Sequence, residues 1–225
     1  MEEYLSERQQ IEHVRGFIRE NAPWAFAGLL IAVGGFVGWQ QWHAWQDRQA
    51  ASASAKYGAM LVALGNGDLD GGARAATELR ESYSRSAYTD LAALALAGAE
   101  VREGKLAAAA GHLEPVVNGG RDPELRLVAR LRLARVQRAL GKPELALATL
   151  AAAPAGTAGG AYADLRGDLL ADKGDLPGAI AAWREALASK TAGAVDRELV
   201  QLKIVAAGGS PEPAGPAAPA AGDAP

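Results

Sequence analysis

The chain of 225 residues carries 23 basic and 26 acidic side chains, and this even balance lacks the clustered basic surface of a nucleic-acid-binding protein. It contains no cysteine, which excludes disulfides, thiol catalysis and cysteine-based metal sites. Because Ala and Leu recur throughout and no alternating β-branched run with hairpin turns occurs, the sequence predicts an all-α protein.

An uncharged segment lies near the N-terminus. Its apolar part, Ala22–Trp39, corresponds to about 27 Å of helix, close to the thickness of a bilayer core. We therefore predict a cytoplasmic tail at 1–21 and a transmembrane helix at 22–45. A buried core helix and a cleavable signal peptide, with Ala-x-Ala patterns in 50–55, are the alternatives. We favour an uncleaved anchor.

Basic residues near the ends of this segment predict its orientation. The tail side offers Arg8, Arg15 and Arg19, whereas the other flank offers Arg48 and Lys56. Because Lys and Arg concentrate on the cytoplasmic side, this weak bias places the N-terminus in the cytoplasm and the bulk of the chain outside.

Tryptophans mark both borders of the segment. Trp24 lies at one edge, and Trp39 and Trp42 lie at the other, where indole rings settle at the lipid headgroups. Trp45 continues the same helical face and is a candidate for a partner contact at the membrane surface. Within the span, Gly34 and Gly38 form a small-xxx-small pair, a pattern that permits close packing of another helix in lipid.

Three stretches between residues 97 and 183 share one pattern. In each, a glycine is followed five residues later by Ala and four residues after that by a larger apolar residue, and a small residue lies seven positions before the glycine. The sets are Ala97/Gly104/Ala109/Leu113, Ala134/Gly141/Ala146/Leu150 and Gly167/Gly174/Ala179/Trp183. Each copy predicts one helical hairpin that stacks on its neighbours. We expect the small residue of the first helix to let the second helix cross closely, and the large residue of the second helix to fill the gap against the next repeat. The stretch around Gly67 is a degenerate fourth copy.

The pattern resembles the tetratricopeptide repeat, whose period is about 34 residues. The predicted fold is therefore all-α, with a single N-terminal transmembrane helix followed by tetratricopeptide-like helical-hairpin repeats, an α-solenoid. We expect a helical or flexible linker at 46–56 and the repeat domain at 57–207. Residues 208–225 are rich in Pro, Ala and Gly and contain almost no large apolar residue, which predicts a disordered tail.

No catalytic constellation is recognisable in the sequence. The three histidines lie in different segments, and His112, the one within the repeats, is interpreted as a surface residue. Nucleophile elbows, phosphate-binding loops and calcium hands are missing. We expect neither an enzyme nor a cofactor.

The candidate binding surface is the groove lined by the first helices of the hairpins. Its predicted residues form three rows at helical spacing: Leu91, Leu94 and Val101; Arg132, Arg135 and Arg138; Asp164, Asp168 and Asp172. Two interpretations remain open. Either the rows contact a partner chain, or the basic and acidic rows neutralise one another across the repeats, in weak exposed pairs.

Particular segments resemble the YfgM family of ancillary SecYEG translocon subunits. They are "QIEHVRGFIREN", "VGGFVGWQQW", "SASAKY", "LRLARVQ" and "YADLRGDLLADKGDLPGAIAAW", within residues 7–205. The resemblance implies an inner-membrane protein with one helix, a cytoplasmic N-terminus and periplasmic repeats. It implies SecYEG and a PpiD-like membrane-anchored chaperone as partners, and a role in passing exported polypeptides to periplasmic chaperones.

The resulting hypothesis is a non-enzymatic, membrane-tethered adaptor. The alternative is a tethered repeat scaffold that assembles another cell-envelope complex. A third class, an exported soluble enzyme, would require cleavage of the anchor and a catalytic site that the sequence does not show.

Overall fold

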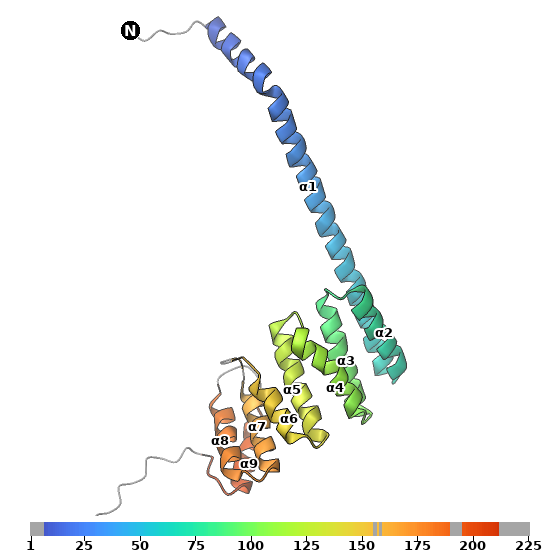
Figure 1. Cartoon of the computed structure of the whole chain (residues 1–225), viewed down its shortest axis with the longest axis vertical. Helices are drawn as coiled ribbons and strands as arrows, with labels where there is room; N and C mark the ends of the chain where they lie inside the picture. The colour runs from blue at the N-terminus through green and yellow to red at the C-terminus, as the bar shows by residue number, and fades with distance from the viewer. Residues whose placement is uncertain (1–6, 155–156, 158, 190–194, 212–225) are drawn as a thin grey trace, which may run out of the picture. The chain divides into compact units, whose positions relative to one another are not determined.

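The computed structural model describes residues 7–154, 157, 159–189 and 195–211. Side chains are described for residue 24 and from residue 27 onward within those ranges. The chain divides into two units, residues 1–52 and 53–225 (Figure 1). The first helix runs through the boundary between them, so the second unit begins inside a helix.

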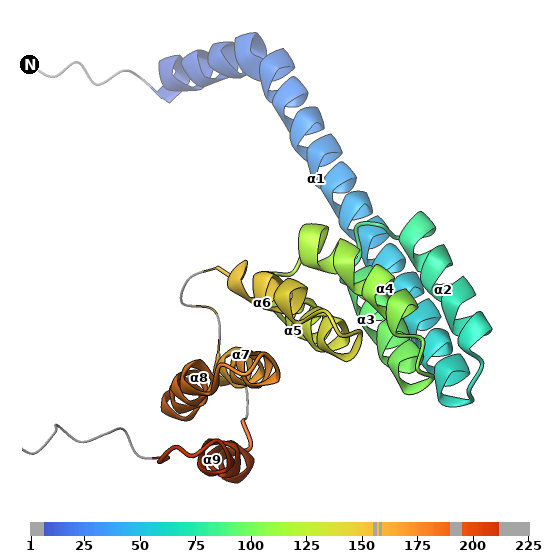
Figure 2. The same ribbon diagram turned by 60° about the horizontal axis from the view of Figure 1, so that its bottom comes forward.

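All regular structure in the described residues is α-helical. The helices are α1 (Glu7–Gly65), α2 (Leu69–Ser82), α3 (Ala87–Arg102), α4 (Leu106–Gly119), α5 (Pro123–Ala139), α6 (Pro143–Ala151), α7 (Gly160–Asp172), α8 (Leu176–Ala188) and α9 (Arg197–Ala206). In the second unit, helices that follow one another along the chain pack together, and each hairpin stacks on the next (Figure 2). The predicted hairpin architecture is confirmed.

The hairpins share one turn. Gly67, Gly104, Gly141 and Gly174 each follow the first helix of a pair with φ between 71° and 82°, a conformation that other residues rarely adopt. At the first full copy, the Gly104 amide donates to the Val101 carbonyl at 3.0 Å, and the next amide reaches back to Glu100 at 2.8 Å. This is a Schellman turn, which satisfies the last carbonyls of the helix. At the degenerate copy the amides of Gly67 and Asp68 donate to the carbonyls of Leu64 and Ala63, at 3.2 and 2.9 Å, so the same turn forms there.

Small residues allow the two helices of each hairpin to approach one another closely. Ala97 and Ala134 are buried, and the alanines five residues after the turn glycines are fully buried. At the third copy, a Cβ added to Gly167 would lie 2.5 Å from the indole of Trp183. The large residues behind them fill the core: Leu113, Leu150 and Trp183 are all buried. The roles assigned to these positions from their spacing are confirmed.

Aspartates and prolines lie at the N-termini of helices in the second half of the array. The side chain of Asp122 accepts hydrogen bonds from the amides of Glu124 and Leu125 and caps α5. Asp175 caps α8 in the same manner, through the amide of Gly178. Prolines occupy the first turns of α5, α6 and α8, where a missing N–H leaves no hydrogen bond unmade.

Packing at the ends of the repeat unit also involves residues outside 57–207, the range expected for the repeats. Ala53 is fully buried in the first core cluster, with Met60 and Leu79, so packing begins within the predicted linker. At the other end α9 extends to residue 206. The chain after it lies against α8, where the Ser210 carbonyl accepts two hydrogen bonds from Arg184. Residues 212–225 of the predicted tail lie outside the described residues.

The N-terminal unit is the first part of α1. Trp24, Trp39 and Trp42 are all exposed, and the rings of Trp42 and Trp45 lie 5.6 Å apart. Side chains added at Gly34 or Gly38 would meet no described atom within 4 Å. Within the described part of the chain, no helix combines the length and apolar character needed to cross a membrane. The side chains of residues 22, 23, 25 and 26, at the start of the predicted span, lie outside the described part of the chain.

Candidate functional site

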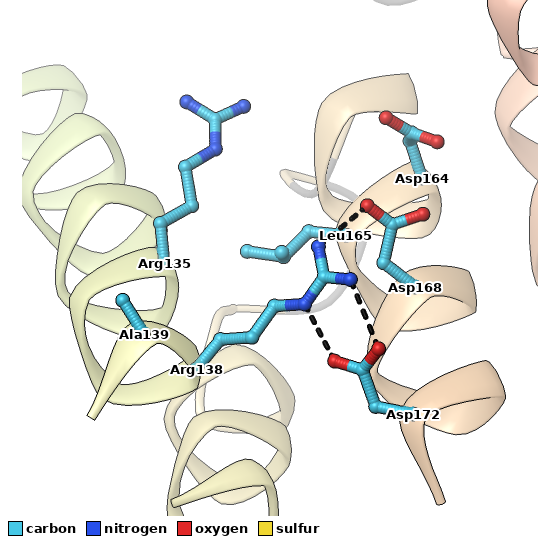
Figure 3. Close-up of a pocket in the computed structure, with 7 residues that line it drawn as sticks. All are labelled: Arg135, Arg138, Ala139, Asp164, Leu165, Asp168 and Asp172. Carbon is cyan, nitrogen blue, oxygen red and sulfur yellow. Dashed lines mark hydrogen bonds and ion pairs between the residues drawn. The ribbon is translucent and has the colours of Figure 1, made fainter. Parts of the chain in front are cut away.

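A pocket of about 450 Å³ opens between α5 and α7 (Figure 3). Basic residues approach it from α5 and acidic residues from α7. Its lining consists of Arg135, Arg138, Ala139, Asp164, Leu165, Asp168 and Asp172. Five of these are residues that the sequence assigned to the basic and acidic rows, and the structure brings them together because α5 and α7 are the first helices of adjacent hairpins.

Arg138 joins the two rows. Its Nε and Nη2 atoms donate to both oxygens of Asp172, at 2.6 and 3.0 Å, and its Nη1 atom donates to Asp168 at 2.9 Å (Figure 3). The bidentate geometry matches the planar guanidinium to a carboxylate. These hydrogen bonds lower the pKa of Asp172 and raise the pKa of Arg138. The interpretation in which the rows neutralise one another is therefore correct for Arg138.

Asp168 is the most heavily bonded carboxylate of the pocket. Its Oδ1 atom accepts a hydrogen bond from the indole Nε1 of Trp183 at 3.1 Å and pairs with Lys203 at 2.7 Å. Lys203 also reaches Asp164 at 2.8 Å. Burial lowers the pKa of Lys203, but the bonds to Asp164 and Asp168 outweigh it and leave the pKa raised. Lys203 of α9 thus pairs with two carboxylates of the acidic row.

Arg135 differs from the other charged residues of the pocket. It is exposed on α5, and it has no hydrogen-bond or ion-pair partner among the residues that the structure describes. Figure 3 shows its guanidinium group apart from the paired carboxylates. Arg132, one turn earlier, donates to the backbone carbonyl of Leu94 at 3.2 Å and so ties α5 to α3. The pocket therefore presents one unpaired cation beside a network of two cations and three carboxylates.

The apolar row on α3 is placed differently from the charged rows. Leu94 is only 4% exposed and packs in the core with Leu113 and Leu133, so it does not form part of an accessible surface. Leu91 is half-buried, whereas Val101 is exposed. The helical spacing was read correctly, but the stacking of α5 on α3 covers the middle of this face.

Sequence reasoning missed two contributors to the pocket. Trp183 was assigned to packing alone, and its Nε1 also holds Asp168. Lys203 lies 39 residues beyond Asp164 and in a helix with no turn-glycine pattern before it. The i, i+4 spacing of Val200 and Ile204 in "RELVQLKIVA" was the available indication of a further helix.

Further polar contacts lie outside this pocket. Nε2 of His112 lies 3.3 Å from Oε1 of the buried Glu100, beside a smaller pocket of about 200 Å³ between α2, α3 and α4. Among the described residues, no group of three or more His, Asp or Glu side chains is placed to hold a metal ion. Asp68 uses its carboxylate to cap α2 through the amide of Gly71.

Comparison with known proteins identifies the family. A family model described as a tetratricopeptide repeat-like domain matches residues 15–209. The ancillary SecYEG translocon subunit of Escherichia coli (strain K12) is 35% identical over 204 residues, which cover 91% of this chain and 98% of that protein. The chain belongs to the YfgM family of ancillary SecYEG translocon subunits.

Other YfgM-family proteins match over the same extent. The ancillary SecYEG translocon subunit of Haemophilus influenzae is 26% identical over 89% of this chain and 97% of its own length. The protein of the same name from Neisseria gonorrhoeae is 26% identical over 91% of this chain and 98% of its own. No solved structure matches the chain. Membership in the YfgM family, whose members are repeat-containing ancillary subunits, makes this chain a non-catalytic adaptor.

Proposed function

We propose that this chain is a membrane-tethered adaptor that associates with the SecYEG translocon and helps to pass exported polypeptides to periplasmic chaperones. The observation that carries the proposal is the extent of the similarity. A relative named ancillary SecYEG translocon subunit aligns over 98% of its own length, so the N-terminal segment and the repeats are both shared. A PpiD-like membrane-anchored chaperone is the proposed second partner.

The tether is residues 22–45, in a single-pass orientation with the N-terminus in the cytoplasm and the repeats in the periplasm of a bacterial inner membrane. Large apolar side chains are exposed along this part of α1, including Leu30, Ile31 and Phe36. An apolar helix face that the rest of the chain leaves uncovered is expected where lipid or another membrane helix covers it. The exposed Trp24, Trp39 and Trp42 suit the two headgroup regions.

The pocket between α5 and α7 is the proposed contact for a partner chain. Arg135 offers an unpaired guanidinium, which binds carboxylates in a fixed two-pronged geometry. The pair that Arg138 makes with Asp172 is exposed, so its charges are open to exchange with those of a partner. Tethering beside the translocon raises the local concentration of the repeats, and weak contacts then suffice.

The test is site-specific photocrosslinking in intact inner membranes. A photoreactive residue at position 45 is expected to capture a SecYEG subunit, and one at position 139, an exposed position that lines the pocket beside Arg135, an exported polypeptide or a periplasmic chaperone. Position 114 on the exposed side of α4 is the control for random collisions. Capture of a different envelope complex at position 45 supports the alternative scaffold function. Capture of no translocon subunit at all defeats the proposal.

A charge reversal tests the binding role of the pocket independently of the tether. Arg135→Glu is expected to reduce capture at the pocket several-fold while leaving capture at position 45 unchanged. Arg85→Glu makes the same change of charge at an exposed arginine outside the pocket, and serves as the control. A second variant exchanges the charges of the Arg138–Asp172 pair. Arg138→Asp and Asp172→Arg together preserve the pairing but reverse its polarity. Unaltered capture by both altered proteins would argue that the rows are purely structural.

A further inference from the structure

A buried carboxylate crosses the hairpin of α3 and α4. Nε2 of His112, on α4, lies 3.3 Å from Oε1 of Glu100, on α3. The Glu100 side chain is only 8% exposed, whereas the imidazole is 37% exposed and lines the pocket of about 200 Å³ between α2, α3 and α4. The second oxygen of Glu100, Oε2, is buried and has no hydrogen-bond partner among the described residues. The carboxylate therefore depends on one histidine.

The two residues occupy matched positions of the repeat. The glutamate lies four residues before the turn glycine of its hairpin, and the histidine lies eight residues after it. In the next hairpin these positions hold Gln137 and Thr149, and Oγ1 of Thr149 donates to Oε1 of Gln137 at 2.8 Å. In the third hairpin they hold Leu170 and Ala182. The repeat thus accepts a neutral polar pair or two apolar residues here, and the hairpin of α3 and α4 differs from both because its two side chains titrate.

Charged residues on the helices around this pair do not provide a second counter-charge. Among the residues that the structure describes, none of them forms an ion pair with Glu100 or His112. Arg80 and Asp90 line the same small pocket as the imidazole, and Asp90 accepts a hydrogen bond from the backbone amide of residue 121. The others are exposed: Glu103 at the end of α3, Lys105 and Glu114 on α4, and Arg132 on α5.

The charge of the imidazole decides whether Glu100 has a counter-charge. Histidine is the side chain whose charge ordinarily changes between pH 5 and 8. On the acid side of this range the imidazole is a cation, and the pair is complete. On the alkaline side Nε2 can still donate a hydrogen bond but the ring carries no charge, so the carboxylate remains buried without a cation. Breaking a buried pair in this manner is strongly destabilising.

We infer that the Glu100–His112 pair is a pH-sensitive latch between α3 and α4, closed when the imidazole is protonated and weakened when it is neutral. The stability that the latch contributes is present on the acid side and is lost as the pH rises. The hairpins of α5–α6 and α7–α8 carry neutral residues at these positions and lack this dependence. The latch lies outside the pocket between α5 and α7, so its test is independent of the proposed function.

The next hairpin supplies the matched control. Glu100→Gln and His112→Thr together place the neutral pair of α5–α6 into α3–α4. Thermal unfolding of the full chain in detergent is measured from pH 6 to pH 8.5. Relative to the double variant, the wild-type protein is expected to lose at least about 3 °C in melting temperature over this range. His43→Gln removes a histidine outside the repeats and is expected to keep the wild-type dependence.

Hydrogen exchange locates the effect within the array. At pH 8.5 the amides of residues 100–113 are expected to exchange about five-fold faster in the wild-type protein than in the double variant. The amides of α7 and α8 are expected to exchange equally in both proteins. If the double variant does not fold, His112→Gln replaces it, because glutamine keeps a donor for Glu100 but never carries a charge.

Two results would overturn the inference. The first is the same pH dependence of melting temperature in the wild-type protein and in the neutral variant, which would mean that Glu100 keeps a proton throughout the range or does not need the charge of the imidazole. The second is a loss of stability that hydrogen exchange places in α7 and α8 rather than in α3 and α4.

Discussion

The contact between Gly167 and Trp183 gives the sharpest prediction about the fold. A Cβ added at Gly167 would lie 2.5 Å from both Cδ1 and Nε1 of the indole, and 2.9 Å from a third ring atom. Trp183 is 4% exposed and donates to Asp168, so the ring has nowhere to move without loss of that hydrogen bond. Gly167→Ala is therefore expected to destabilise the repeat unit.

The expected loss of stability in Gly167→Ala follows from two opposing effects. Overpacking of this severity lies in the upper part of the usual range, about 2–3 kcal/mol. Replacing a glycine within a helix by alanine returns about 1 kcal/mol, because the unfolded chain loses less freedom. The net loss is about 1–2 kcal/mol in the free energy of unfolding, or about 3–6 °C in the melting temperature of a unit of this size.

The assay is urea and thermal unfolding followed by far-UV circular dichroism. Gly98→Ala is the matched control, because Gly98 also lies within a first helix, α3, but an added Cβ there would meet no described atom within 4 Å. It is expected to be neutral or to stabilise by about 0.5–1 kcal/mol. A Gly167→Ala protein as stable as the Gly98→Ala protein would refute the role assigned to close packing at this position.

Three further substitutions test other contacts. The hydrogen bonds from Arg138 lower the pKa of Asp172 in the folded state below its usual 3.8. The stability that this pair contributes is therefore complete above about pH 4 and is lost as the pH falls through the pKa of the folded state. Asp172→Asn should reduce this loss of stability at acid pH, in unfolding curves measured between pH 2 and 6. Burial raises the pKa of Tyr162 to about 12, and its hydroxyl donates to the Leu127 carbonyl at 2.7 Å. Tyr162→Phe should cost about 1 kcal/mol and remove the last step of the spectrophotometric tyrosine titration, and a titration unchanged in that step would contradict the assignment. Leu79→Ala, at a fully buried side chain, should cost about 2–5 kcal/mol in urea unfolding, and a loss below about 1 kcal/mol would place Leu79 outside the core.

The hairpins were predictable because their determinants are local. A glycine at positive φ, an alanine five residues later and a small residue seven before all belong to one hairpin, within about 20 residues of sequence. The relation between Gly167 and Trp183 follows from this spacing alone, because both residues are fixed relative to Gly174. Even the degenerate copy at Gly67 retained enough of the pattern to be located.

The pocket was predictable only in part. Helical spacing places Asp164, Asp168 and Asp172 on one face, and the structure keeps them there. Spacing within a helix does not determine which basic residue reaches them, since that depends on how two hairpins stack. Arg138 pairs with the acidic row and Arg135 does not. The burial of Leu94 has the same origin, because it depends on the approach of α5 rather than on α3 itself.

The bonds of Asp168 have a consequence for how the array unfolds. Hairpins that contact only their neighbours can fray from an end, one after another. Asp168 accepts hydrogen bonds from α5 and α8 and pairs with Lys203 of α9, so three helices share one carboxylate. Detachment of α9 leaves Asp164 and the half-buried Asp168 short of a cation, so the loss of α9 carries an electrostatic cost. The C-terminal half of the array is therefore expected to melt cooperatively, as a single transition rather than helix by helix from its end.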